Sequence, residues 1–203
     1  PPRDLALAEA MRSRSLWLFT VAMLVCGSAD FLVMTHLAPM VNDYGLSEAT
    51  AADMLAWLGL LSLPGALVAG RAAESIGNKP PMIITFACRV ALFLMVLFVK
   101  GPVPFWVFSL GFGFTLLVTA PLTWTLISTL YGVTNIGFIS GFINTVHTVG
   151  GGLGAYLAGV VVDSTHNYDL AFLVSAVMAG VAMVCSLLIR EKRHLAREDE
   201  PLY

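Results

Sequence analysis

Six apolar stretches, each about as long as a helix that crosses a lipid bilayer, constrain this chain more than any other feature. A hydrocarbon core of roughly 30 Å takes about 20 residues of helix to cross. Charged residues make up only 12% of the chain and the mean hydropathy is +0.83, well above what a soluble core requires. The sequence therefore predicts an all-α membrane protein with six transmembrane helices, placed at Ser15–Met40, Thr50–Gly70, Pro80–Val99, Val103–Leu130, Ile136–Val162 and Asp169–Arg190.

An internal repeat divides these stretches into two groups of three. The segment 65–78 aligns without a gap with 154–167, at an offset of 89 residues (154 − 65 = 89). A period of this length indicates two copies of a unit of three membrane helices, at about 15–99 and about 103–190. The shared identities are Gly65, Ala66, Ala69, Gly70, Ser75 and Asn78, matched by Gly154, Ala155, Ala158, Gly159, Ser164 and Asn167.

The distribution of basic residues predicts how the chain lies in the membrane, because cytoplasmic loops carry an excess of lysine and arginine. With the N-terminus inside, Lys100 falls outside and Arg89 lies within a span. The other basic residues fall inside: Arg3, Arg12, Arg14, Arg71, Lys79, Arg190, Lys192, Arg193 and Arg197. We therefore expect a multi-pass protein of the cell (inner) membrane with two cytoplasmic ends, a linker tail at 1–14 and a C-terminal tail at 191–203. The segment Gly70–Lys79 then lies inside and its counterpart Gly159–Asn167 outside, so the two units have inverted topology.

Five polar side chains stand out within the spans, where a charge is costly unless it faces protein or water. Asp30 and His36 are interpreted either as proton- or solute-handling groups in a cavity or as a structural acid and an interfacial imidazole. Arg89 needs Asp30, backbone carbonyls, water or an anionic ligand as a partner. Asn144 and His147 are three residues apart, so both can point from one helix face into a cavity. His147 is interpreted as a titrating group or as a helix-to-helix hydrogen-bonding group.

The fifth span is rich in glycine, which favours close helix packing. Gly137 with Gly141, and Gly150 with Gly154, are pairs of small residues four apart that let a neighbouring helix approach. The fourth span contains Pro121, where we expect its helix to break.

Several chemistries lack support in the sequence. Cys26, Cys88 and Cys185 lie in separate spans without a CxxC pair, so neither a disulfide framework nor a zinc site is indicated. No Walker A, GxSxG or HExxH sequence is present. We therefore expect no metal site, no cofactor and no enzyme activity. Burial of the chain in lipid and its net charge of −2 argue against nucleic acid as a partner.

The connection between the second and third spans resembles a family signature. Gly70, Glu74, Gly77 and Lys79 match the G-x3-D/E-x2-G-x-K/R pattern found between the second and third helices of each half of major facilitator superfamily transporters. Glutamate stands here where aspartate is usual.

Two further stretches carry the same resemblance. The run Tyr131–Phe172 is similar to the tenth-to-twelfth helix region of that superfamily, particularly of monocarboxylate and oxalate/formate carriers. The run Thr35–Gly45 is similar to the end of the seventh helix. The second span departs from monocarboxylate carriers because it lacks their Asp/Arg pair, with Trp57 four residues after Asp53.

The resemblance implies the C-terminal six-helix half of a twelve-helix secondary transporter. The first, second, fourth and fifth spans would line a central cavity, which favours Asp30, Asn144 and His147 over Arg89 as cavity residues. The signature loop would lock the cytoplasmic side: Glu74 would accept hydrogen bonds from a helix N-terminus, and Arg71 or Lys79 would pair across helices. The implied partners are the lipid bilayer, a small-molecule substrate, and an N-terminal six-helix half or a second copy.

Three functional hypotheses follow. The first is an alternating-access carrier of a small organic solute such as a monocarboxylate, with or without proton coupling. The second is a six-helix membrane protein without transport activity, acting as an assembly or sensory partner. A third and weaker hypothesis, an intramembrane enzyme using Asp30, His36 and His147, lacks a recognisable motif.

Overall fold

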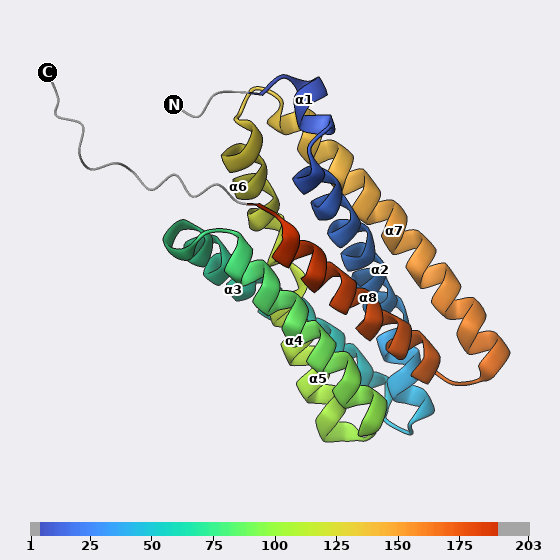
Figure 1. Ribbon diagram of the computed structural model, residues 1–203. Helices are drawn as coiled ribbons and strands as arrows, with labels where there is room; N and C mark the ends of the chain where they lie inside the picture. The colour runs from blue at the N-terminus through green and yellow to red at the C-terminus, as the bar shows by residue number, and fades with distance from the viewer. Residues whose placement is uncertain (1–4, 191–203) are drawn as a thin grey trace, which may run out of the picture.

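The computed structural model describes residues 5–190, and every regular element in that range is an α-helix (Figure 1). Six spans in the described part are long and apolar enough to cross a membrane, so the predicted all-α membrane fold is confirmed. Residues 1–4 of the predicted linker and the whole tail 191–203 lie outside the described residues. The helices are α1 (Leu7–Met11), α2 (Arg14–Asp43), α3 (Glu48–Ile76), α4 (Lys79–Phe98), α5 (Pro102–Leu116), α6 (Thr119–Tyr131), α7 (Ile136–Thr165) and α8 (Asp169–Leu188).

Helix α3 extends further than its apolar stretch predicted. It continues past Gly70 because hydropathy locates only the part of a helix that lies in hydrocarbon. It stops where Gly77 adopts φ 87°, a left-handed conformation that costs glycine little. Gly70, Arg71 and Glu74 therefore lie on the last turns of a helix, and the prediction that they form a loop is wrong.

The fourth span breaks into α5 and α6 between residues 116 and 119, shortly before Pro121. Proline lacks an N–H group, and its ring clashes with the carbonyl four residues earlier, which here belongs to Leu117. The break therefore falls about one turn before the proline. It leaves carbonyl groups in the last turn of α5 without partners in their own helix.

The two three-helix units pack in a matching pattern. Helix α2 lies along α7, α3 lies along α5, and α4 and α8 pack on each other (Figure 1). In the repeat, α2 corresponds to the fourth span, which contains α5, and α3 corresponds to α7. The contact between α2 and α7 is therefore the counterpart of the contact between α5 and α3, as expected for two repeated units. The repeated glycines behave alike: Gly65 of α3 lies against the backbone of Phe114 in α5, and its copy Gly154 of α7 lies against Ser28 in α2.

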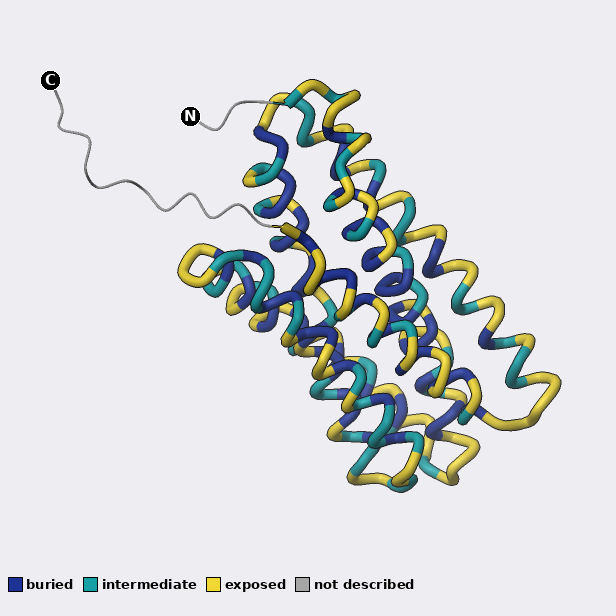
Figure 2. Tube along the Cα trace, viewed as in Figure 1, coloured by how far each residue is buried: buried dark blue, intermediate teal, exposed yellow. Residues whose placement is uncertain are grey.

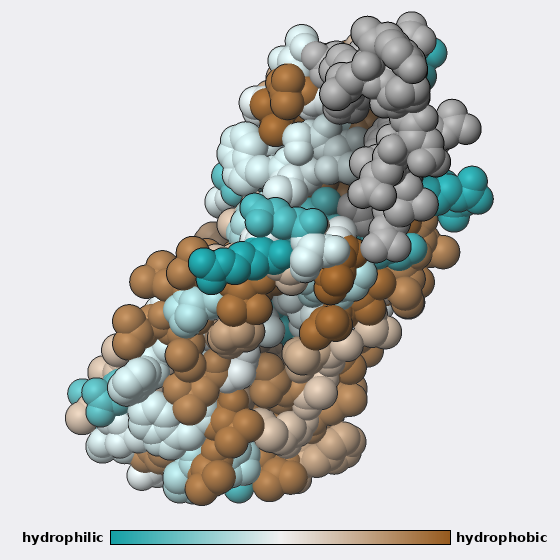
Figure 3. All heavy atoms as spheres, turned by 90° about the vertical axis from the view of Figure 1, so that its left-hand side faces the viewer, coloured by the Kyte–Doolittle hydropathy of each residue, from teal (hydrophilic) through white to brown (hydrophobic). Residues whose placement is uncertain are grey.

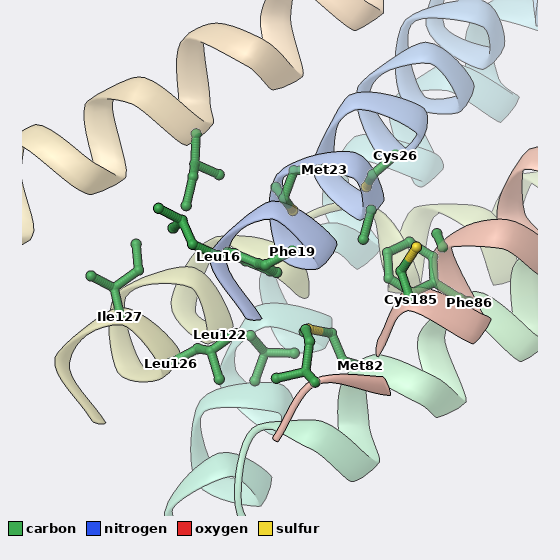
Figure 4. Packing of buried hydrophobic residues seen from close by; sticks show 14 of the residues in the cluster. Leu16, Phe19, Met23, Cys26, Met82, Phe86, Leu122, Leu126, Ile127 and Cys185 are labelled. Atoms are coloured by element: carbon green, nitrogen blue, oxygen red, sulfur yellow. The ribbon is translucent and has the colours of Figure 1, made fainter. Parts of the chain in front are cut away.

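Buried apolar residues form two clusters, one toward each end of the bundle. The first joins α2, α4, α6 and α8 through side chains such as Phe19, Met82 and Phe86, which Figure 4 shows converging. The second is aromatic, with Phe93 and Phe108 from α4 and α5 packed at 5.5 Å between ring centroids. The clusters meet near the middle of the spans.

Apolar side chains also cover much of the outer surface. Figure 2 shows exposed positions along the outward side of α7, and Figure 3 shows hydrophobic residues spread over one face of the molecule. Leu67 of α3 and Tyr156 of α7 are 68% and 69% exposed. Such a surface suits lipid or other membrane helices as its surroundings.

The short helix α1 is fastened to the end of the bundle where α6 and α7 connect. The Leu5 N–H donates to the Tyr131 carbonyl at 3.1 Å, and the Asn135 side chain donates to the Leu5 carbonyl at 3.2 Å. The Ser13 and Tyr131 hydroxyls lie 3.0 Å apart. These bonds hold the described part of the predicted linker against the α6–α7 connection.

Candidate functional site

A cavity of about 350 Å³ lies between α2, the broken fourth span and α7. Asp30, Phe31 and Met34 of α2 form one wall, and residues on both sides of the break in the fourth span form another. Helix α7 contributes three polar side chains to the lining, Ser140, Asn144 and His147. The cavity is concave and mostly apolar with a few convergent polar groups, as small-molecule sites usually are.

Asp30 is the centre of a buried charged cluster that borders this cavity. Its Oδ1 lies 2.8 Å from Nη1 of Arg89, and its Oδ2 lies 3.2 Å from Nε2 of His147. Arg89 is completely buried and Asp30 is 5% exposed. The cluster thus joins α2, α4 and α7, and its members Asp30 and His147 both line the cavity.

The Arg89 guanidinium also makes hydrogen bonds to other groups inside the protein. Nη2 and Nε donate to the carbonyl and hydroxyl of Thr115, at 3.0 and 3.3 Å, in the last turn of α5. Nη1 lies 3.1 Å from the Cys26 sulfur, and the guanidinium is 4.8 Å from the centroid of the Phe112 ring. Because the helix breaks here, the Thr115 carbonyl accepts from the Val118 N–H at 3.4 Å and from Arg89, in place of the N–H four residues on that a continuous helix would offer. Arg89 does not line the cavity.

The same cluster contains the described residues that could hold a metal ion. Ligand atoms of Cys26, Asp30 and His147 all lie within 4.8 Å of one another. The Arg89 guanidinium already contacts both Cys26 and Asp30, so a bound cation would face a fixed positive charge.

The structure brings together some of the predicted cavity residues and separates others. Asp30, Asn144 and His147 line one cavity, whereas His36 lies apart from it with Nε2 3.0 Å from the Ala155 carbonyl. Asn144 has an exposed side chain, without a hydrogen bond to any described residue.

Lys79, one of the residues predicted to lock the cytoplasmic side, bonds to another part of the described bundle. The Lys79 ammonium donates to the Ile189 carbonyl at 3.1 Å, just past the end of α8. Glu74 lies on α3 with an exposed side chain and bonds to no helix N-terminus in the described part of the chain. A locking role for these residues stays a prediction.

The four predicted packing glycines fall into two pairs with different surroundings. A side chain at Gly150 or Gly154 would collide with Leu24 or Ser28 of α2, so these two permit close approach of α7 to α2. Gly137 and Gly141 face open space, with no described residue within 4 Å of where a Cβ would lie. The expected packing at this second pair is not found, because no helix of the described bundle lies on that side of α7.

Sequence reasoning did not single out three residues that the site contains. Cys26 and Thr115 lie beside Arg89, and Ser140 lines the cavity. Of these three residues, only Ser140 could have been found from sequence spacing, because it precedes Asn144 by four residues and His147 by seven. These intervals place all three on one face of a helix.

Comparison with known proteins places this geometry in a family. The family model described as the Major Facilitator Superfamily matches residues 12–202. An MFS-type transporter of Bacillus subtilis, YcxA, is 28% identical over 193 residues, covering 92% of this chain and 47% of that protein. Monocarboxylate transporter 13 of Bos taurus is 24% identical over 83% of this chain and 41% of its own. A gallate transporter of Pseudomonas putida is 27% identical over 85% and 39%.

A solved structure shows the same fold. The crystal structure of the E. coli fucose:proton symporter FucP matches with a TM-score of 0.79 and 20% identity, over 92% of this chain and 45% of that one. This chain spans about half the length of the relatives that it matches. The chain belongs to the major facilitator superfamily.

Proposed function

We propose that this chain forms one six-helix half of an alternating-access secondary transporter for a small organic solute. The cavity supports this proposal most directly, because a cavity bordered by a buried acid and a histidine in membrane-spanning helices is a site for solute and proton handling. The other wall would come from a second six-helix half or a second copy of this chain. Transport would be a rocking of the halves around the cavity.

The orientation in the membrane is part of the proposal. The end of α8 lies at the same end of the bundle as α1, because the Arg190 N–H donates to the Ser15 hydroxyl at 3.4 Å and Lys79 bonds to the Ile189 carbonyl. The α6–α7 connection is also found at this end (Figure 1). By the positive-inside rule this end is cytoplasmic, in the cell (inner) membrane. Lys100 lies at the opposite end, where it is paired with Asp169 at 2.5 Å.

His147 is proposed as the group that gains and loses the transported proton. The charged and titratable groups that face it are Asp30 and Cys26 of α2, with Arg89 of α4 behind them. Arg89 holds Asp30 through a direct ion pair, so the carboxylate is fixed in place to accept a hydrogen bond from protonated His147. Imidazole is the side chain whose charge changes most readily near neutral pH.

Among small organic solutes, we propose a monocarboxylate, because several relatives are named as monocarboxylate transporters. The Arg89 guanidinium is already bound to Asp30 and Thr115, so its N–H groups do not bind the solute. Protonated His147 is then the cation that can meet a carboxylate in the cavity. A proton and an anion bound together would carry no net charge, which lowers the cost of crossing the low-dielectric centre of the membrane.

Uptake into liposomes containing the full-length protein tests the proposal. Under an inwardly directed proton gradient, we expect labelled lactate or benzoate to accumulate above its external concentration, and a protonophore to abolish the accumulation. Liposomes without protein are the control for passive entry. Uptake indistinguishable from that control for every acid tested, with folded protein present, would contradict the proposed function.

A further inference from the structure

Ser140 carries a buried hydroxyl that has no hydrogen-bond partner among the described residues. The residue is 4% exposed and lies in the first half of α7, where it lines the cavity. An unsatisfied polar atom is costly in a protein interior, and each case calls for an explanation. Bound solute or water in the cavity would supply the missing partner.

Comparison with other buried hydroxyls shows that Ser140 is unusual. Five of them in the described helices donate to the carbonyl four residues earlier, at 2.7 to 2.9 Å: Thr20, Thr85, Thr123, Ser175 and Ser186. This is the ordinary way in which a helical serine or threonine satisfies its hydroxyl inside a membrane protein. Ser140 does not use it, although its own helix continues back to Ile136.

Asn144 is a second polar residue of α7 that lines the cavity near Ser140. It lies one turn beyond Ser140 on the same face of α7, lines the same cavity, and its amide has no partner among the described residues. Seven residues of helix separate Ser140 from His147, which is roughly 10 Å along the axis. The polar groups of α7 therefore form a stripe, with the charged cluster at one end and neutral groups at the other.

We infer that Ser140 and Asn144 form a neutral subsite that recognises a hydroxyl group of the transported solute. A hydroxyl both donates and accepts, which matches an amide oxygen and a serine hydroxyl. Rotation about the single side-chain torsion of serine aims Oγ at the solute. This inference rests on the proposed function, with the carboxylate held at His147. It names the class of solute as hydroxylated acids in preference to their deoxy analogues.

Matched pairs of acids test the subsite. The pairs are 4-hydroxybenzoate with benzoate and 6-hydroxyhexanoate with hexanoate, whose hydroxyl lies far enough from the carboxylate to reach toward Ser140. The affinity of each acid for the full-length protein is obtained from the rise in thermal unfolding midpoint with concentration. We expect the hydroxylated acid of at least one pair to bind about tenfold more tightly, because the deoxy acid leaves the buried Ser140 hydroxyl unpaired. In Ser140→Ala the preference should fall to within about twofold while the deoxy acid keeps its affinity.

Ser186→Ala is the matched control, because Ser186 is a buried serine of α8 bonded to its own helix. It should retain the preference for the hydroxylated acid. A second readout needs no solute: Ser140→Ala should unfold at the wild-type temperature or above, since its hydroxyl has no protein partner to lose.

Three results would contradict the proposed subsite. A hydroxyl preference that is absent in the wild type or unchanged in Ser140→Ala overturns the subsite and leaves the proposed transport function standing. A Ser140→Ala protein that unfolds well below Ser186→Ala also overturns the subsite, because the hydroxyl is then structural. Failure of all four acids to bind or to enter liposomes overturns the monocarboxylate proposal together with the subsite.

Discussion

Replacing Arg89 by methionine is expected to destabilise the fold by about 3–5 kcal/mol, the usual cost of removing one partner from a buried ion pair. Arg89 is fully buried and Asp30 is 5% exposed, so neither charge can turn to water. The variant leaves Asp30 facing His147 without its main counter-charge. Reversible unfolding of purified protein in mixed detergent micelles measures the loss.

The control for this experiment is the double variant Asp30→Asn/Arg89→Met, which removes both charges. We expect it to recover most of the lost stability, because neither a carboxylate nor a guanidinium is then buried alone. Asp30→Asn by itself should be destabilised, since Arg89 keeps its charge. If Arg89→Met and the double variant are both as stable as wild type, the ion pair does not hold α2 and α4 together as described.

Replacing Gly65 or Gly154 by alanine is expected to destabilise the bundle by about 1–3 kcal/mol, as overpacking of a tight interior does. An added Cβ at Gly65 would collide with the backbone of Phe114, and one at Gly154 with the Cα and side chain of Ser28. Because these glycines are the two copies of one repeated position, both interfaces should respond. Thermal unfolding midpoints of the two variants measure the effect.

Gly59→Ala and Gly152→Ala are the matched controls on the same two helices. Both positions face open space, with no described residue within 4 Å of a Cβ. Alanine is the better helix former by about 0.5–1 kcal/mol, so these controls should be neutral or slightly stabilising. Equal effects at packed and open positions would show that the close helix approaches do not set the stability.

The sequence was sufficient for the architecture but not for the ends and breaks of its helices. Long apolar runs located six spans, because crossing a bilayer demands a length of helix that few other folds need. It could not show that α3 continues to Ile76, since charged turns such as the one with Arg71 and Glu74 remain helical in water. The break at 117–118 was misplaced because proline disturbs the residue one turn before it.

The candidate site shows a similar division. The cost of charge in a membrane pointed to Asp30, Arg89 and His147 individually. Their pairing depends on how three helices are rotated and how far each is shifted, and Asp30 and His147 are 117 positions apart in the chain. Ser140 escaped notice because a serine in a span usually bonds to its own helix, and only the absence of that bond distinguishes it.

The most direct test of the central claim compares two transport assays on His147→Gln, which removes the titrating imidazole and leaves the Asp30–Arg89 pair in place. We predict that this variant still exchanges labelled acid for unlabelled acid across liposome membranes, but no longer accumulates it under a proton gradient. Accumulation equal to wild type in His147→Gln, with exchange intact, would contradict the claim that the buried cluster couples protons to solute movement.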